Sequence, residues 1–178
     1  KHVIEVNVEM DVVIGPFLSH LARKLGVVYS TADGDQPSLA AGMVEWARSL
    51  GLEVITAGKG TSLYTPAQRE KKIKNNPDLS WSTICYLDGT KSQIEMASLA
   101  NITGLIPDTP GFHHPRADLE EAVEIFSVKN NKKGILAAPG VVDFLNCINE
   151  AGKVIEPRVI NGVFVVVTTS KTHSLQLM

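Results

Sequence analysis

Apolar and polar positions near the start of the chain follow two periods in turn, one typical of strands and one typical of helices. Residues 2–8 are rich in β-branched side chains and predict a strand. Gly15-Pro16 then opens a predicted helix over residues 17–25, and a second short strand follows over residues 27–31. The first 31 residues therefore predict a strand, a helix and a strand in succession.

The same order continues in the next part of the chain. The turn-rich stretch 32–37 leads into an amphipathic helix over residues 38–50, which Gly51 closes. Residues 52–57 predict a third strand that runs into a Gly58-Lys59-Gly60 turn. The polar, lysine-rich stretch 61–80 is expected to be mostly loop.

The second half predicts further strands and helices, with β-structure at the end. The expected elements are a strand over 81–87, a helix over 90–101, a loop rich in Pro, Gly and His over 107–115, a short acidic helix over 117–126 and β-structure over 154–169. Strands that alternate with helices indicate an α/β fold, with a parallel or mixed sheet flanked by helices and a β-rich C-terminal segment.

Composition excludes several classes of partner. The chain has 178 residues, and its 17 basic and 19 acidic residues are scattered, so no patch for nucleic acid or an anionic membrane is expected. The longest apolar run, residues 163–167, is too short to cross a bilayer, and the first residues lack the plan of a signal peptide. The two cysteines have no zinc-site spacing and suit a reducing compartment, which predicts a cytoplasmic protein.

Polar clusters stand at four places where a predicted strand ends. They cover residues 7–11, 33–37, 58–60 and 88–91. Loops at the carboxyl ends of parallel strands converge at one edge of a sheet, where ligands bind. The sequence therefore predicts an active site built from these four clusters.

The first chemical candidates are two aspartates and a lysine. Asp33 and Asp35 could carry acid/base chemistry, because two nearby carboxylates push each other's pKa apart, or they could form a tight turn in which Asp35 caps the next helix. Lys59, between Gly58 and Gly60, could bind an anion or donate a proton to a carbonyl, or it could be an exposed loop lysine. Residue type and spacing leave both alternatives open.

The stretch Asp88-Gly89-Thr90-Lys91 is typical of an anion cradle at the start of a helix. Thr90 would cap the helix and Lys91 would lie at the positive end of its dipole, although an ordinary capped turn has the same residues. Glu95 lies four residues after Lys91, which favours an ion pair within the helix.

No metal site and no complete nucleotide site are expected in this chain. The only histidine doublet, His113-His114, lies in a loop that could close over a ligand, and no third metal ligand stands nearby in sequence. The chain contains neither G-x-G-x-x-G nor G-x-x-x-x-G-K-[ST].

Five sequence blocks resemble a known family when they are taken in order. They are K-H-V-I-E-V-N-V-E, G-V-V-Y-S-T-A-D-G-D-Q-P, E-V-I-T-A-G-K-G, L-D-G-T-K-S-Q-I-E-M-A-S-L-A-N and P-G-V-V-D. Together they resemble the homoserine-dehydrogenase-like oxidoreductases that carry a C-terminal SAF domain. One branch of that family is similar to deoxyxylulose-phosphate reductoisomerase.

The resemblance implies three regions and a cofactor. Residues 1–32 would end a Rossmann domain, residues 33–135 would form a catalytic and dimerising domain, and residues 136–178 would begin the SAF module. NADP or NAD would be bound mainly by a region upstream of this chain, with Asn7 and Glu9 beside it. Homoserine dehydrogenases have an asparagine–lysine pair where this chain has Asn7-Val8, which favours a different substrate.

The leading hypothesis is the substrate-side part of an NAD(P)-dependent oxidoreductase that acts on a small hydroxylated, anionic metabolite. Lys59 and Lys91 would hold its charge, and Asp33 or Asp35 would orient or deprotonate it. The other expected substrate contacts are Gln36, Gly58, Gly60, Asp88, Thr90, Glu95 and His113. The alternatives are a reductoisomerase that converts a phosphorylated ketose with NADPH, a non-catalytic oligomerisation or ligand-sensing module, and a lyase or aldolase with Lys59 as its Schiff-base amine.

Overall fold

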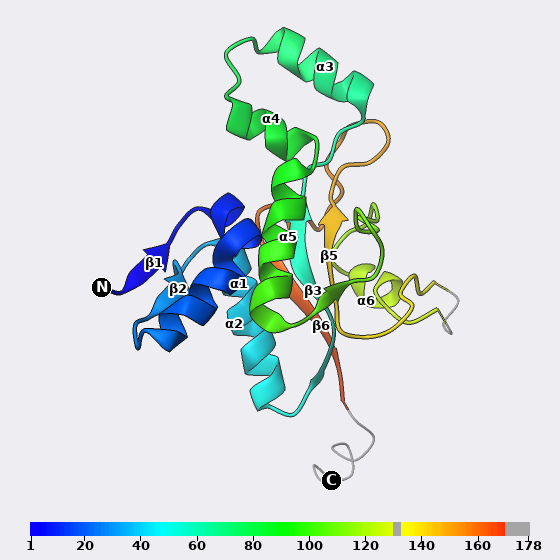
Figure 1. Ribbon diagram of the computed structural model, residues 1–178. Helices are drawn as coiled ribbons and strands as arrows, with labels where there is room; N and C mark the ends of the chain where they lie inside the picture. Colours follow the sequence, from blue (N-terminus) through cyan, green and yellow to red (C-terminus); the bar gives the residue numbers. More distant parts are fainter. Residues whose placement is uncertain (130–132, 170–178) are drawn as a thin grey trace.

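A mixed four-stranded sheet forms the centre of the molecule. The computed structural model describes residues 1–129 and 133–169. The strands of this sheet lie in the order β4 (Ile106–Pro107), β5 (Val141–Asn146), β3 (Glu53–Thr61) and β6 (Val163–Thr168). β4, β5 and β3 run parallel, and β6 is antiparallel to β3. The predicted α/β fold with a mixed sheet flanked by helices is confirmed (Figure 1).

Helices and loops cover both faces of this sheet. On one face, α2 (Gln36–Ser49) and α5 (Thr90–Thr103) bury a core that includes Val44, Met96 and Phe144. On the other face, α6 (Ala122–Ile125) and its neighbouring loops bury a second core around Phe126 and Leu145. Both cores are held by burial of apolar surface, so β3 and β5 lie between two apolar layers.

The N-terminal residues form a small unit beside α5. β1 (Val3–Glu5) pairs in parallel with β2 (Tyr29–Thr31), and α1 (Val8–Lys24) connects them (Figure 1). The strand predicted over residues 2–8 is too long, because Asn7 caps the N-terminus of α1 and accepts a hydrogen bond from the Met10 amide.

The predicted start of this helix at Gly15-Pro16 is also wrong, because both residues lie inside α1. Pro16 has no N–H to donate to the carbonyl one turn earlier, that of Val12. The Asn101 side chain approaches this carbonyl instead, at 3.5 Å. A contact from α5 thus replaces the hydrogen bond that proline removes.

Two helices replace elements that the sequence predicted otherwise. The stretch 61–80 contains α3 (Pro66–Asn75), which begins with a capping box between Thr65 and Gln68. The strand predicted over residues 81–87 is wrong, because this segment is α4 (Trp81–Leu87) and Ser80 caps it through the Thr83 amide. A run of seven residues is too short for periodicity to separate a strand from a helix. Both helices project beyond the end of the sheet (Figure 1).

The C-terminal part supplies strands, as expected, and these join the same sheet. β5 and β6 both pair with β3, so the sheet contains strands from both sides of residue 135. The β-structure predicted over residues 154–169 contains a strand only in its last part, β6, and the predicted helix over residues 117–126 is reduced to α6. The bounds of the three domains stay a prediction, and residues 130–132 of the second domain and 170–178 of the last lie outside the described residues. Within those described residues, no helix is long and apolar enough to cross a membrane.

Candidate functional site

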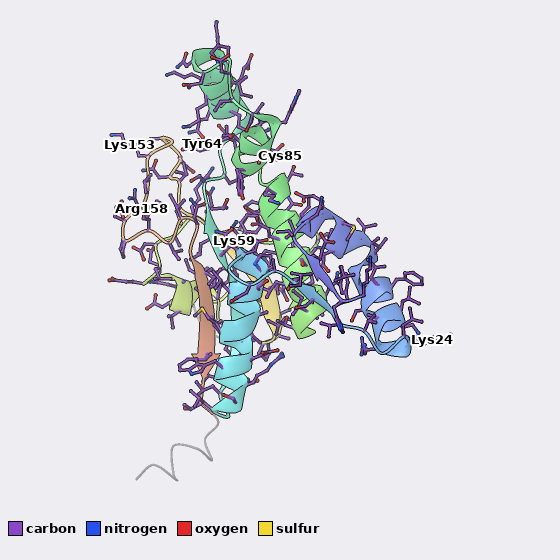
Figure 2. All side chains as sticks on the ribbon, turned by 90° about the vertical axis from the view of Figure 1, so that its left-hand side faces the viewer. Lys24, Lys59, Tyr64, Cys85, Lys153 and Arg158 are labelled. Carbon is purple, nitrogen blue, oxygen red and sulfur yellow. The ribbon has the colours of Figure 1, made fainter. Side chains whose placement is uncertain are left out.

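Lys59 lies in the middle of the molecule, inside a strand. The predicted Gly58-Lys59-Gly60 turn is wrong, because all three residues belong to β3, and the Lys59 side chain is fully buried. Figure 2 shows Lys59 close to the start of α2, whereas Lys24 lies at the outer end of α1. Lys59 is therefore not an exposed loop lysine.

The glycines beside Lys59 allow close backbone packing. A Cβ at Gly58 would lie 1.7 Å from the Asp143 carbonyl oxygen, and a Cβ at Gly60 would lie 2.3 Å from the Val159 carbonyl oxygen. Each glycine thus admits a neighbouring segment and keeps β3 extended between its partners. Their expected contact with substrate stays a prediction.

Three side chains from separate elements surround the Lys59 ammonium group. It forms an ion pair with Glu95 of α5 and donates a hydrogen bond to Gln36 Oε1 at the start of α2. It also lies 5.4 Å from the centre of the Tyr86 ring, a distance suited to a cation–π interaction. We call Lys59, Glu95, Gln36 and Tyr86 the lysine cluster.

Burial dominates the electrostatics of the cluster. It lowers the pKa of Lys59, and the charge of Glu95 opposes this shift without cancelling it. Burial also raises the pKa of Tyr86, and the negative charge of Glu95 raises it further. A lysine with a lowered pKa exchanges its proton more readily near neutral pH, which suits acid/base chemistry.

A cavity of about 400 Å³ opens beside the cluster. It is lined by Asp35, Gln36, Thr61, Ser62, Tyr86, Ile160 and Asn161. Gln36 connects the cavity wall to the cluster, because its Oε1 accepts from Lys59 while its Nε2 donates to the Asn161 carbonyl at 2.7 Å. The volume is sufficient for a small metabolite.

The structure separates the two predicted aspartates. Asp35 is the N-cap of α2, with its Oδ1 2.9 Å from the Gln36 amide, and it also lines the cavity. Asp33 is exposed and does not line the cavity. The prediction that Asp35 caps the helix is confirmed, whereas the catalytic roles of both aspartates stay predictions.

Lys91 pairs with Glu9 rather than with Glu95. Its Nζ lies 2.8 Å from Glu9 Oε1, which joins the first turn of α5 to the first turn of α1. Burial acts to lower the pKa of Lys91, but the bond to Glu9 outweighs it and holds this pKa above its usual value. The predicted ion pair within the helix is wrong, because Glu95 turns to the buried Lys59.

The turn before α5 is held by Asp88. Its Oδ1 accepts from the Thr90 amide at 2.9 Å, and Oδ2 lies 3.6 Å from the Arg69 guanidinium. The prediction that Thr90 caps α5 is wrong, because Gly89 is the N-cap and makes no side-chain cap bond. Asp88 and Thr90 as substrate contacts stay predictions.

The remaining predicted site residues lie apart from the lysine cluster. Asn7 caps α1, and its role beside a cofactor stays a prediction. His113 lies in the loop along β5, where its Nε2 is 2.7 Å from Asp108 and its amide donates to Asp143. Among the described residues, no hydrogen bond or ion pair joins His113 to Lys59, so its role in substrate binding also stays a prediction.

Residues 34–178 match the family described as Oxidoreductase DRL, catalytic domain. The chain belongs to this family. No curated protein was found to match it. The matched region contains the whole lysine cluster and the lining of its cavity, so both belong to an oxidoreductase catalytic domain.

Sequence reasoning missed several groups of this DRL catalytic domain. Tyr86 was overlooked because its segment was predicted to be a strand, although Ser80, directly before that segment, is a typical helix-start residue. Asn161 was overlooked because a backbone carbonyl carries its contact, and no residue type marks such a contact in advance. Across residues 1–129 and 133–169, no group of three or more His, Cys, Asp or Glu side chains could hold a metal ion.

The lowered pKa of Lys59 predicts how stability depends on pH. The folded state binds fewer protons at this group than the unfolded state, for which the usual value is 10.5. The contribution of Lys59 to stability is therefore present above 10.5 and is lost as pH falls through the folded-state pKa.

Chemical unfolding at a series of pH values tests this expectation. The free energy of unfolding of the wild type should increase, relative to that of the Lys59→Met/Glu95→Gln double variant, as pH rises toward 10.5. The double variant is the matched control, since every other titrating group is common to both proteins. A difference that shrinks as pH rises would contradict the lowered pKa.

Proposed function

We propose that this chain forms the substrate-binding and proton-transfer part of an NAD(P)-dependent oxidoreductase. The substrate would be a small metabolite that carries a hydroxyl or carbonyl group and a negative charge. The buried ion pair of Lys59 and Glu95 beside a polar cavity is the observation that carries the proposal. A fully buried lysine is costly to desolvate, and such groups concentrate at functional sites.

The cluster can transfer a proton but cannot accept a hydride. In the oxidising direction the Lys59 amine would take the proton of the substrate hydroxyl. In the reducing direction the Lys59 ammonium would return a proton to the carbonyl oxygen. The nicotinamide would supply the hydride chemistry. Glu95 and Gln36 would hold the amine toward the cavity and steady its charge.

Polar groups around the cavity would orient the substrate. Asp35 and Thr61 could bond to its hydroxyl groups, and the Tyr86 ring could cover one side of it. Lys91 would attract its negative charge, since its side chain is partly exposed and its pKa is held above the usual value. The two lysines would thus act differently, because Lys59 would move a proton and Lys91 would bind an anion.

The finer assignments come from the resemblance to homoserine-dehydrogenase-like enzymes with a C-terminal SAF domain. They include NADP or NAD bound mainly outside this chain, a homodimer, and a reductoisomerase as the alternative reaction. Only a reductoisomerase would rearrange the carbon skeleton before reduction. Product structure therefore separates it from a simple dehydrogenase, and sedimentation velocity tests the dimer.

Isotope transfer tests the proposed reaction in the full-length protein. With NADPH or NADH that carries deuterium at both C4 positions, the product of reduction should carry one deuterium at the former carbonyl carbon. Anionic hydroxy and keto acids and phosphorylated ketoses form the substrate panel, and their uncharged analogues are the controls. Reduction without deuterium transfer, or no turnover of any anionic compound, would overturn the proposal.

The Lys91–Glu9 pair predicts opposite effects of two substitutions. Lys91→Met should raise KM for the anionic substrate roughly 10- to 100-fold and change kcat little, because it removes one charged hydrogen bond to the bound anion. Glu9→Gln should lower KM, because Lys91 then no longer has a competing carboxylate. The uncharged substrate analogue is the control, and equal effects on both substrates would contradict the assignment.

A further inference from the structure

A second buried carboxylate lies outside the lysine cluster. Asp11 of α1 is only 5% exposed, and both of its oxygens accept hydrogen bonds from hydroxyl groups. Tyr29 of β2 donates to Oδ1 at 2.9 Å, and Ser98 of α5 donates to Oδ2 at 2.6 Å. Asp11 thus joins α1 to β2, the next element of the chain, and to α5, which is distant from both in the sequence.

No ion pair in the described part of the chain includes Asp11. Burial and the Asp11 carboxylate together raise the pKa of Tyr29, so this hydroxyl keeps its proton and remains a donor. A buried carboxylate bound only by neutral hydroxyls gains less than an ion pair, and apolar side chains of similar size would fill such a site at lower cost.

The backbone leaves room for the Asp11 side chain. A Cβ at Gly15, one turn further along α1, would lie 2.3 Å from Asp11 Oδ1. The carboxylate therefore occupies space that any other residue at position 15 would take. Gly15 and Asp11 are thus packed against each other, and Asp11 lies on the face of α1 that contacts α5.

The α5 residue bonded to Asp11 shares a face with the catalytic candidates. Lys91, Glu95 and Ser98 are separated by four and three residues, so they lie along one stripe of the helix. Lys91 bonds to Glu9 of α1, Glu95 pairs with Lys59, and Ser98 bonds to Asp11. The bond to Ser98 therefore fixes the rotation of α5 on which the direction of Glu95 depends.

We propose that Asp11 is a positioning residue that holds α5 against α1 and β2, so that Glu95 stays directed at Lys59. The inference rests on the proposed function of the lysine cluster. It also connects the N-terminal unit to that cluster, since α1 and β2 both precede the matched catalytic region. A small shift of a positioned group can cost about 100-fold in rate.

Four variants of the full-length protein test the proposal. Asp11→Leu removes both hydrogen bonds, Asp11→Asn keeps its shape and can bond to both hydroxyls, and Tyr29→Phe and Ser98→Ala each remove one bond. The measurements are kcat, KM, the urea unfolding midpoint, and the ¹³C resonance of the Lys59 ε-carbon in lysine-labelled protein. Lys59→Arg identifies that resonance.

Asp11→Leu should lower kcat roughly 10- to 100-fold and change KM less than about threefold, without a comparable loss of stability. The Lys59 resonance and its titration should shift in the same variant. Asp11→Asn should restore kcat to within about threefold of the wild type, and Ser98→Ala should reduce it more than Tyr29→Phe does, because only Ser98 lies on α5.

Two results would overturn the positioning role. One is an Asp11→Leu protein with the kcat and Lys59 resonance of the wild type. The other is a fall in kcat that, in every variant, is no larger than the fall in the fraction of folded protein. The Lys59 resonance keeps this test separate from the proposed function, because it reports the position of Glu95 even if Lys59 itself proves dispensable for turnover.

Discussion

Lys59→Met should lower turnover of the full-length enzyme roughly 10²- to 10⁴-fold, the loss typical of a missing acid/base or electrostatic group. Methionine has a straight side chain that can fill most of the same buried space, but it can neither donate nor accept the proton. The expected loss is largest at this position because Lys59 is the buried cation of the lysine cluster, in contact with Glu95 and with Gln36, which lines the cavity.

A second substitution separates chemistry from folding. Lys59→Met alone leaves the buried Glu95 carboxylate without its cation and should cost about 3–5 kcal/mol of stability. Adding Glu95→Gln removes that charge and should recover much of the stability without recovering turnover. The two measurements are steady-state kinetics and urea unfolding of the single and double variants.

Lys24→Met is the matched control for these variants. Lys24 lies at the end of α1, far from the lysine cluster (Figure 2), and its substitution should leave turnover unchanged. A Lys59→Met enzyme that keeps more than about a tenth of wild-type turnover would discard the acid/base role. Recovery of turnover in the double variant would discard it as well.

The largest effect on stability alone is expected at Asp143 of β5. Its fully buried carboxylate accepts three backbone N–H bonds: Oδ1 from His114 and Phe144 at 3.0 and 2.7 Å, and Oδ2 from His113 at 3.0 Å. The loop that Asp143 holds includes Phe112 and His114, whose backbone φ angles are 66° and 39°. Residues other than glycine rarely adopt such values. Asp143 therefore holds a strained loop against the strand next to β3.

Asp143→Ala should lower the free energy of unfolding by about 3–5 kcal/mol, because three backbone N–H groups, that of Phe144 buried and those of His113 and His114 partly buried, lose their acceptor. Asp143→Asn should cost less, about 1–3 kcal/mol, since its amide keeps one acceptor oxygen. The exposed Asp33→Asn is the control and should stay within about 0.5 kcal/mol of the wild type. Urea unfolding of the three variants and the wild type measures these changes. Equal free energies of unfolding for Asp143→Ala and Asp33→Asn would contradict the role of Asp143.

Local sequence signals identified most elements whose ends are marked by caps. The helix predicted over residues 38–50 is α2 within two residues at its start, because Asp35 and Gly51 mark its ends. The segment 81–87 was mistaken for a strand, because its few residues carry too weak a period and the Ser80 cap was not weighed. The glycines at 58 and 60 suggested a turn, whereas pairing with β5 and β6 keeps them extended.

The sequence by itself determined the α/β class and proposed Lys59, Gln36 and Glu95 as site residues, since strand and helix periods and the residue types with suitable chemistry are local properties. Tertiary structure alone decided that Lys59 is buried. It also decided that Glu95 pairs with Lys59, 36 residues away, and not with Lys91 on the same helix. Packing of α5 on β3 made that choice: the buried face of α5 carries Ser92, Glu95 and Ser98, and helical periodicity reveals an inward face by its apolar residues. Polar side chains that share an inward face with the apolar Met96 and Leu99 are recognisable only once their partners on the neighbouring strand and helix are in place.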